Sequence, residues 1–191
     1  MTALGFTVKS GWARSVLLAG PPNAPRVVDS LRVELSDPSK PESRQPYHDG
    51  FGTARAAGDE LTQLVDSAVR FGRRSVMNLI EQYKKEGHQV AGIGLVVGSL
   101  VDPERLGNSH VRIHALEGQL FRGIVVDAAV QSSLAYTIWR ERDLYPDAIT
   151  RLKRSNTELR RALTQLGLPL AASWRAEHKV AALAAWLVLS G

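Results

Sequence analysis

The chain has 191 residues, which is enough for one domain with a real core and only marginally enough for two. Its formal net charge of +5 permits a polyanionic partner such as nucleic acid without requiring one. The absence of cysteine excludes disulfides and cysteine-ligated metals, so any metal must be held by histidines and carboxylates. The N-terminus lacks a secretory pattern and the last apolar run is too short to span a bilayer, so we expect a cytoplasmic protein without membrane attachment.

The first part of the chain predicts an antiparallel meander of three strands. Residues 5–8 and 12–18 are rich in β-forming side chains, and a short Lys-Ser-Gly turn separates them. A Gly-Pro-Pro-Asn breaker at 20–23 comes before residues 26–35, in which apolar and polar side chains alternate. Strands that follow one another so closely usually pair in sequence order.

The segment 36–58 is predicted to be a long loop. It contains three prolines and three glycines and has no helical or strand periodicity. Loops of this length are either functional or mobile. Because the segment also carries Tyr47, His48 and Asp49, we consider both a structural flap and a loop that contacts a substrate or partner through His48.

The remainder of the chain alternates helices and strands. The pattern predicts a helix at 59–86, a buried strand at 90–100 and a helix after Asn108 or Ser109. A short strand at 135–139 follows, then a basic helix at 146–166 that begins with a proline, and a final apolar helix that ends at Leu189. This order predicts one α/β domain over 1–191. Its mixed sheet would contain the meander and two further strands, with helices on both faces.

The predicted second helix, which begins after Asn108 or Ser109, holds a group of candidate ligands. His110, His114 and Glu117 are spaced so that they project from one helical face, and two imidazoles with a carboxylate can bind a transition metal. The alternative is that these side chains only solvate the helix start and bond their neighbours. Arg112 and Arg122 on the same helix are candidate binding residues, although Arg122 can equally form an ion pair within the helix.

Three further residues lie where open α/β sheets bind ligands. Asp102 follows the predicted buried strand at its carboxyl end, where it acts either in a site or as a turn cap. Lys9 and Ser10 occupy the first turn, from which they can contact a phosphate or simply face solvent.

Three short stretches carry a resemblance to a known family. They are GFTVKSG at 5–11, GLVVG at 94–98 and HKVAALA at 178–184. Together with the element order, they make the chain similar to the ribonuclease H-like superfamily, in particular to RuvC-type Holliday-junction resolvases and YqgF-type nucleases. The resemblance implies a ribonuclease H-like fold over nearly the whole chain.

The resemblance also implies a site for two Mg²⁺ or Mn²⁺ ions that cleaves phosphodiesters. In that family an acid in the first strand, one after the fourth strand and one on the last helix hold the metals. The match puts Lys9 at the first position, and Lys cannot bind Mg²⁺, whereas Asp102 and Glu177 can supply the other two acids.

The leading hypothesis is therefore a degenerate ribonuclease H-like domain that binds nucleic acid or a protein partner without catalysis. One alternative is a metal-dependent phosphodiesterase with a rearranged site of Asp102, Glu117 and Glu177, assisted by His114. It would use Mg²⁺ or Mn²⁺ at the carboxylates, or Zn²⁺ at the histidines. A scaffold protein that docks through 36–58 is a third alternative, and a homodimer also stays open.

Overall fold

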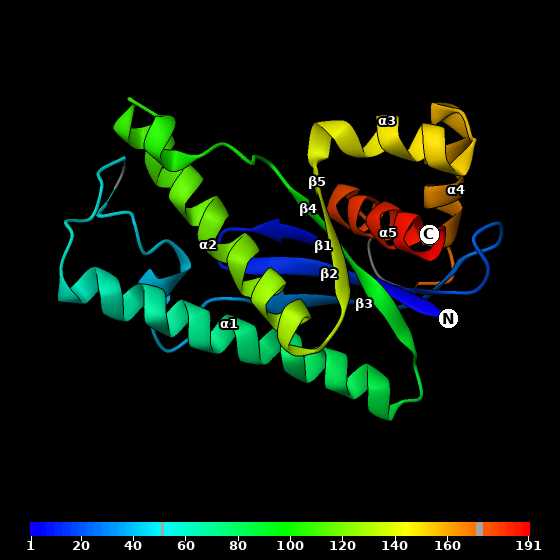
Figure 1. The fold of residues 1–191 in the computed structure, drawn as a ribbon, viewed down its shortest axis with the longest axis horizontal. Helices are drawn as coiled ribbons and strands as arrows, with labels where there is room; N and C mark the ends of the chain where they lie inside the picture. Colours follow the sequence, from blue (N-terminus) through cyan, green and yellow to red (C-terminus); the bar gives the residue numbers. More distant parts are fainter. Residues whose placement is uncertain (51, 171–173) are drawn as a thin grey trace.

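The structure is a computed structural model of the chain, and it describes residues 1–50, 52–170 and 174–191. Within these residues, five strands form one mixed sheet with the order β3-β2-β1-β4-β5 (Figure 1). The strands β1 (Thr2–Lys9), β2 (Trp12–Ala19) and β3 (Arg26–Glu34) are antiparallel neighbours, as the sequence predicts. The strand β4 (Val90–Val97) pairs in parallel with β1, and β5 (Ala135–Arg140) pairs in parallel with β4.

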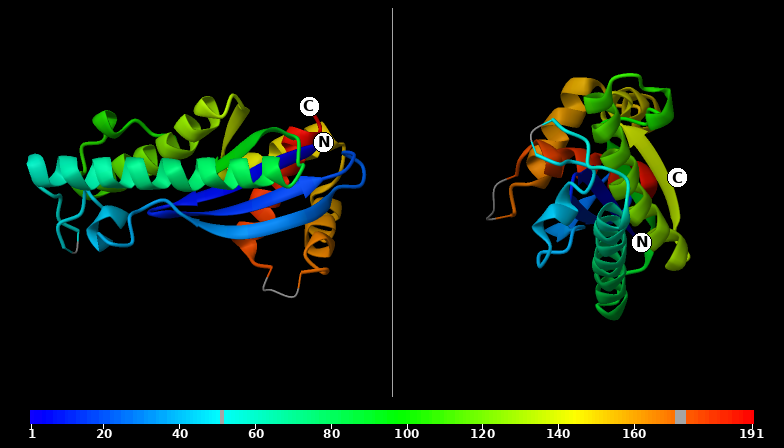
Figure 2. Two further views of the ribbon diagram at one scale, coloured as in Figure 1. Left: turned by 90° about the horizontal axis from the view of Figure 1, so that it is seen from below. Right: turned by 90° about the vertical axis from the view of Figure 1, so that its left-hand side faces the viewer.

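Helices cover both faces of the sheet. On one face lie α1 (Asp59–Lys85) and α2 (Ser109–Gln131), whose apolar sides share a core with Phe6, Leu17 and Leu95. On the other face lies α5 (Ala176–Leu189), which is almost entirely buried and packs on Val16 and Leu18. Figure 2 shows that the two chain ends lie together at one end of the sheet. The predicted α/β class with helices on both faces is confirmed.

The basic segment at 146–166 forms two helices, so the prediction of one helix was wrong. The first, α3 (Glu141–Leu152), begins directly after β5 and contains Pro146 inside it. The second, α4 (Asn156–Leu166), begins after Ser155, whose side chain and main chain form a capping box with Glu158. Lys153 ends α3 with a left-handed φ of 52°, which redirects the chain. The sequence does not reveal this break, because the residues around Lys153 and Ser155 are polar and a helix also tolerates such residues.

The segment between β3 and α1 contains a short 3₁₀ helix, Pro41–Arg44, and a β-bridge between His48 and Ala54. The guanidinium of Arg55 donates to the carbonyls of Pro46 and His48, each at 3.0 Å, which folds the segment onto itself. Figures 1 and 2 place this segment at the end of the sheet where α2 begins. A second short 3₁₀ helix, Pro103–Arg105, lies between β4 and α2.

Among the described residues, no helix combines the length and the hydrophobicity that crossing a bilayer would require.

Candidate functional site

The turn between β1 and β2 lies at the sheet edge where the parallel strands β1 and β4 end. Open α/β sheets bind ligands at this edge. Gly11 has a φ of 78°, which a residue with a side chain rarely adopts, and its carbonyl accepts hydrogen bonds from the main-chain N–H groups of Leu35 and Ser36. The turn is thereby tied to the end of β3 and presents Lys9 and Ser10 at the edge.

Glu117 is a fully buried carboxylate on α2. Its Oε1 lies 2.7 Å from Nδ1 of His48, and the Ser10 hydroxyl donates to its Oε2 at 3.4 Å. Burial raises the pKa of Glu117, while the hydrogen bond and charge of His48 and the charge of His114 oppose the rise. The acid lies between the serine and the histidine, unlike a Ser–His–Asp triad, in which the histidine is in the middle.

Three histidines gather around this carboxylate. The Nε2 atoms of His110 and His114 are 3.3 Å apart, and the ring centroids of His48 and His114 are 5.0 Å apart. One ligand atom from each of His48, His114 and Glu117 lies within 4.8 Å of the other two. The helix spacing placed His110, His114 and Glu117 on one face. The structure groups the latter two with His48 from the 36–58 segment, and His110 reaches the group through His114.

A second set of polar side chains surrounds a cavity of about 750 Å³ on the other side of the turn. Its lining consists of Lys9, Ser10, Trp12, Arg44, Gln45 and Glu177. Lys9 Nζ lies 3.8 Å from a carboxylate oxygen of Glu141, the first residue of α3. The Thr7 hydroxyl donates to the main-chain carbonyl of Glu177 at 2.9 Å, which fixes the start of α5 against β1. Lys9 and Glu177 thus face one cavity.

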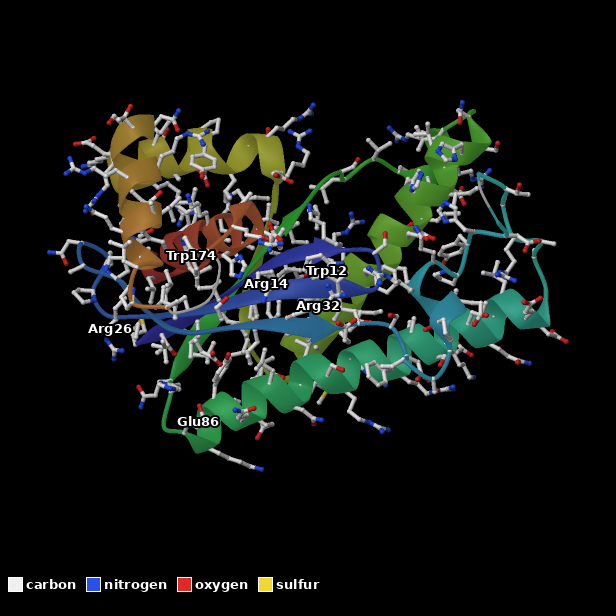
Figure 3. The ribbon with its side chains drawn as sticks, turned by 180° about the vertical axis from the view of Figure 1, so that it is seen from behind. Trp12, Arg14, Arg26, Arg32, Glu86 and Trp174 are labelled. Atoms are coloured by element: carbon white, nitrogen blue, oxygen red, sulfur yellow. The ribbon has the colours of Figure 1, made fainter. Side chains whose placement is uncertain are left out.

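Two arginines beside this cavity were not singled out from the sequence. Arg14 on β2 and Arg32 on β3 are direct cross-strand partners, so their side chains share one face of the sheet (Figure 3). The Arg32 guanidinium lies 4.3 Å from the ring centroid of Trp12. Burial lowers the pKa of Arg14, Glu177 opposes this, and Arg32 adds to it. Among the described residues, Arg14 Nε is buried without a hydrogen-bond partner.

The other candidate residues lie apart from these two groups. Asp102 accepts a hydrogen bond from the main-chain N–H of Glu104 at 3.0 Å and so caps a 3₁₀ helix beyond β4, which is the turn role foreseen as its alternative. Arg122 donates to the carbonyl of Ser99 at 3.4 Å, and burial lowers its pKa. Arg112 is exposed on α2. The cavity beside the turn is not lined by any of these residues.

Comparisons with known proteins agree with this arrangement at the level of the fold. Two solved structures of RuvC from Thermus thermophilus superpose on 98% of the chain at 12% sequence identity. One is a complex with a Holliday junction substrate, with a TM-score of 0.59 over 91% of that chain, and the other has a TM-score of 0.57 over 92%. The chain has a RuvC-type ribonuclease H-like fold. No model of a known protein family and no curated protein sequence matches it.

The RuvC-type fold predicted from the element order is therefore confirmed. Within this fold, β1, the end of β4 and the start of α5 meet beside the first turn. Lys9 and Glu177 occupy that place, and Asp102 lies in the loop beyond it. The alternation of side chains along β2 and β3 indicates which residues share a face of the sheet. Pairing Arg14 with Arg32 also requires the β2–β3 strand register, which the sequence does not provide. The sequence offered His48 as a candidate contact residue of the 36–58 loop, but gave no sign that it lies beside Glu117.

Proposed function

We propose that this protein binds the sugar–phosphate backbone of nucleic acid, without hydrolysing it, at a surface that we name the basic face. The basic face consists of Lys9, Trp12, Arg14, Arg32 and Arg44. The observation that carries the proposal is the cavity of about 750 Å³ with two cations and an indole ring in its lining, next to a pair of aligned arginines.

The Arg32 guanidinium is held in place before any ligand binds. Arg32 stacks on Trp12 and also pairs with Glu34, while Arg14 is held at the same face by the strand pairing. Arginine donates a planar fork of N–H groups that fits a phosphate, and a side chain already ordered loses less entropy on binding. The unpartnered Nε of Arg14 leaves one donor for which an anion is a suitable acceptor.

The same cavity is poorly suited to two-metal hydrolysis. Two ions about 4 Å apart require several carboxylates around them. Among the described residues that line the cavity, Glu177 is the sole carboxylate, and the ammonium of Lys9 lies there with it. A positive side chain repels divalent cations, so the chemistry of this cavity favours binding over cleavage.

Salt-dependent binding to DNA tests the proposal. The RuvC complex contains a Holliday junction, so a labelled four-way junction and a duplex are suitable first ligands for fluorescence anisotropy. We compare wild type with the double variant Arg32→Gln and Arg44→Gln. The matched control carries Arg73→Gln and Arg74→Gln on α1, which covers the opposite face of the sheet and loses the same charge.

The basic-face variant is expected to bind more weakly than the control. On a duplex, its slope of log affinity against log salt should become shallower by about 0.9 for each phosphate that the variant no longer neutralises. Equal reductions of affinity in both double variants, or a wild type without salt-dependent affinity for either DNA, would contradict the proposal and favour a protein partner.

Absence of cleavage is tested separately. Wild type incubated with the junction and Mg²⁺ or Mn²⁺ is expected to leave all strands intact. Cleavage that disappears in Glu177→Gln would replace the binding proposal by the metal-dependent phosphodiesterase alternative.

A further inference from the structure

We infer that His48, His114 and Glu117 bind one zinc-class transition metal ion, which fastens the segment between β3 and α1 to helix α2. The inference does not depend on nucleic-acid binding, because these residues lie in a different group from the basic face. His48 comes from the segment, whereas His114 and Glu117 come from the helix. A shared metal would therefore cross-link positions that are 69 residues apart.

The distances suit a small tetrahedral ion. Zinc bonds of 2.0–2.2 Å to nitrogen and oxygen place neighbouring ligand atoms about 3.3 Å apart. The observed atoms lie within 4.8 Å of one another, and His48 Nδ1 and Glu117 Oε1 are already 2.7 Å apart. Small rotations of these side chains would bring the ligand atoms to the spacing of about 3.3 Å that zinc requires. The Nε2 atoms of His110 and His114, at 3.3 Å, match the spacing of two ligands, so His110 or a water can complete the shell.

The donor set selects the class of metal. Two or three imidazoles with one carboxylate suit zinc and its neighbours, whereas Mg²⁺ prefers oxygen ligands only. Ser10 donates to the second oxygen of Glu117 at 3.4 Å, an outer hydrogen bond of the kind that orients metal-binding carboxylates.

Hydrogen bonds position the main chain at His48 without a metal ion. Arg55 donates to the carbonyls of Pro46 and His48, and His48 also forms a β-bridge with Ala54. Glu117 is 0% exposed, and a buried carboxylate is costly unless a cation or strong hydrogen bonds accompany it. A fixed histidine facing a buried acid is the arrangement that a metal cross-link requires.

Titration of the metal-free, untagged protein with Co²⁺ and Zn²⁺ tests the inference. Co²⁺ is expected to bind with a stoichiometry of one and to give the absorption of a tetrahedral ion, which Zn²⁺ then displaces. His48→Gln and Glu117→Gln should weaken binding by more than about 100-fold, since even outer-shell changes cost 10–100-fold. His88→Gln is the matched control, because His88 lies beside Tyr83 and away from the cluster, and it should bind as wild type does.

Hydrogen exchange provides the second measurement. Zn²⁺ should slow amide exchange across the segment around His48 in wild type and in His88→Gln, but not in His48→Gln. Metal binding that survives His48→Gln, or a segment whose exchange Zn²⁺ leaves unchanged, would overturn the inference. If circular dichroism shows that His48→Gln has lost its fold, the exchange of wild type with and without Zn²⁺, together with Glu117→Gln, decides the question.

Discussion

The contact between β1 and α5 depends on a glycine, which makes its replacement a strong test of the fold around the site. A Cβ atom added at Gly5 would lie 2.8 Å from the carbonyl carbon of Ala181 and 2.9 Å from the main-chain nitrogen of Ala185, and closer still to the Ala181 carbonyl oxygen. Carbon atoms in ordinary contact are about 3.5–4.0 Å apart. The variant Gly5→Ala therefore forces α5 away from the sheet by roughly 0.7 Å or more.

The expected loss of stability follows from two opposing effects. Overpacking a core costs about 1–3 kcal/mol and occasionally more, and the upper end applies here because the obstacle is backbone and not a rotatable side chain. Alanine is intrinsically better than glycine within a strand by roughly 0.5–1 kcal/mol. We therefore expect Gly5→Ala to lower the free energy of unfolding by about 2 kcal/mol or more.

Urea unfolding followed by circular dichroism measures this change, with an unaltered m-value as evidence that the denatured state is the same. Gly98→Ala is the control, since nothing lies within 4 Å of a Cβ added there, and it should change stability by less than about 0.5 kcal/mol. A Gly5→Ala protein as stable as the control would refute the close packing of β1 on α5. The placement of Glu177 beside Lys9 would then also lose its basis.

Three further predictions concern single side chains, and urea unfolding measures each. Ser155→Ala removes the capping box of α4 and should cost about 1 kcal/mol. Tyr83→Phe removes a hydrogen bond of 2.9 Å to Asp29, again at a cost of about 1 kcal/mol, whereas an unchanged stability would argue against this bond. Burial, and then the charge of Arg14, lowers the pKa of His178, so below about pH 6.5 the unfolded chain binds the proton more tightly. Stability should therefore fall as the pH drops through 6.5, and His178→Asn should reduce this fall.

Much of the fold was predictable because its signals are local. The alternation in β3, the uninterrupted apolar run of β4 and the long amphipathic stripe of α1 each reflect a burial pattern that repeats along a few residues. The break between α3 and α4 was missed because Lys153 and Ser155 lie in a polar stretch that a helix also tolerates. The spacing of apolar residues gives no indication that Lys153 adopts a left-handed backbone conformation.

The site was less predictable, because its parts come from distant segments. Helix spacing predicts that His114 and Glu117 share one helical face, and both lie on α2 with ligand atoms within 4.8 Å of each other. It could not add His48, whose position is set by Arg55 and by the bridge to Ala54 within a segment that has no periodicity. Spacing along a chain predicts neighbours only where the backbone conformation is regular.

The two groups also explain why the fold alone does not determine what this chain does. Both meet at one turn, where Ser10 reaches the buried Glu117 on one side and lines the cavity of Lys9 and Glu177 on the other. In that cavity a lysine faces the acid, which favours an anionic ligand, whereas the histidine cluster favours a metal cation. The proposed anion site and the proposed metal site would therefore share one edge of the sheet in a ribonuclease H-like fold. Ser10→Ala tests the link between the two groups: zinc affinity is expected to fall, because Ser10 donates to Glu117, whereas salt-dependent DNA affinity is expected to stay as in wild type.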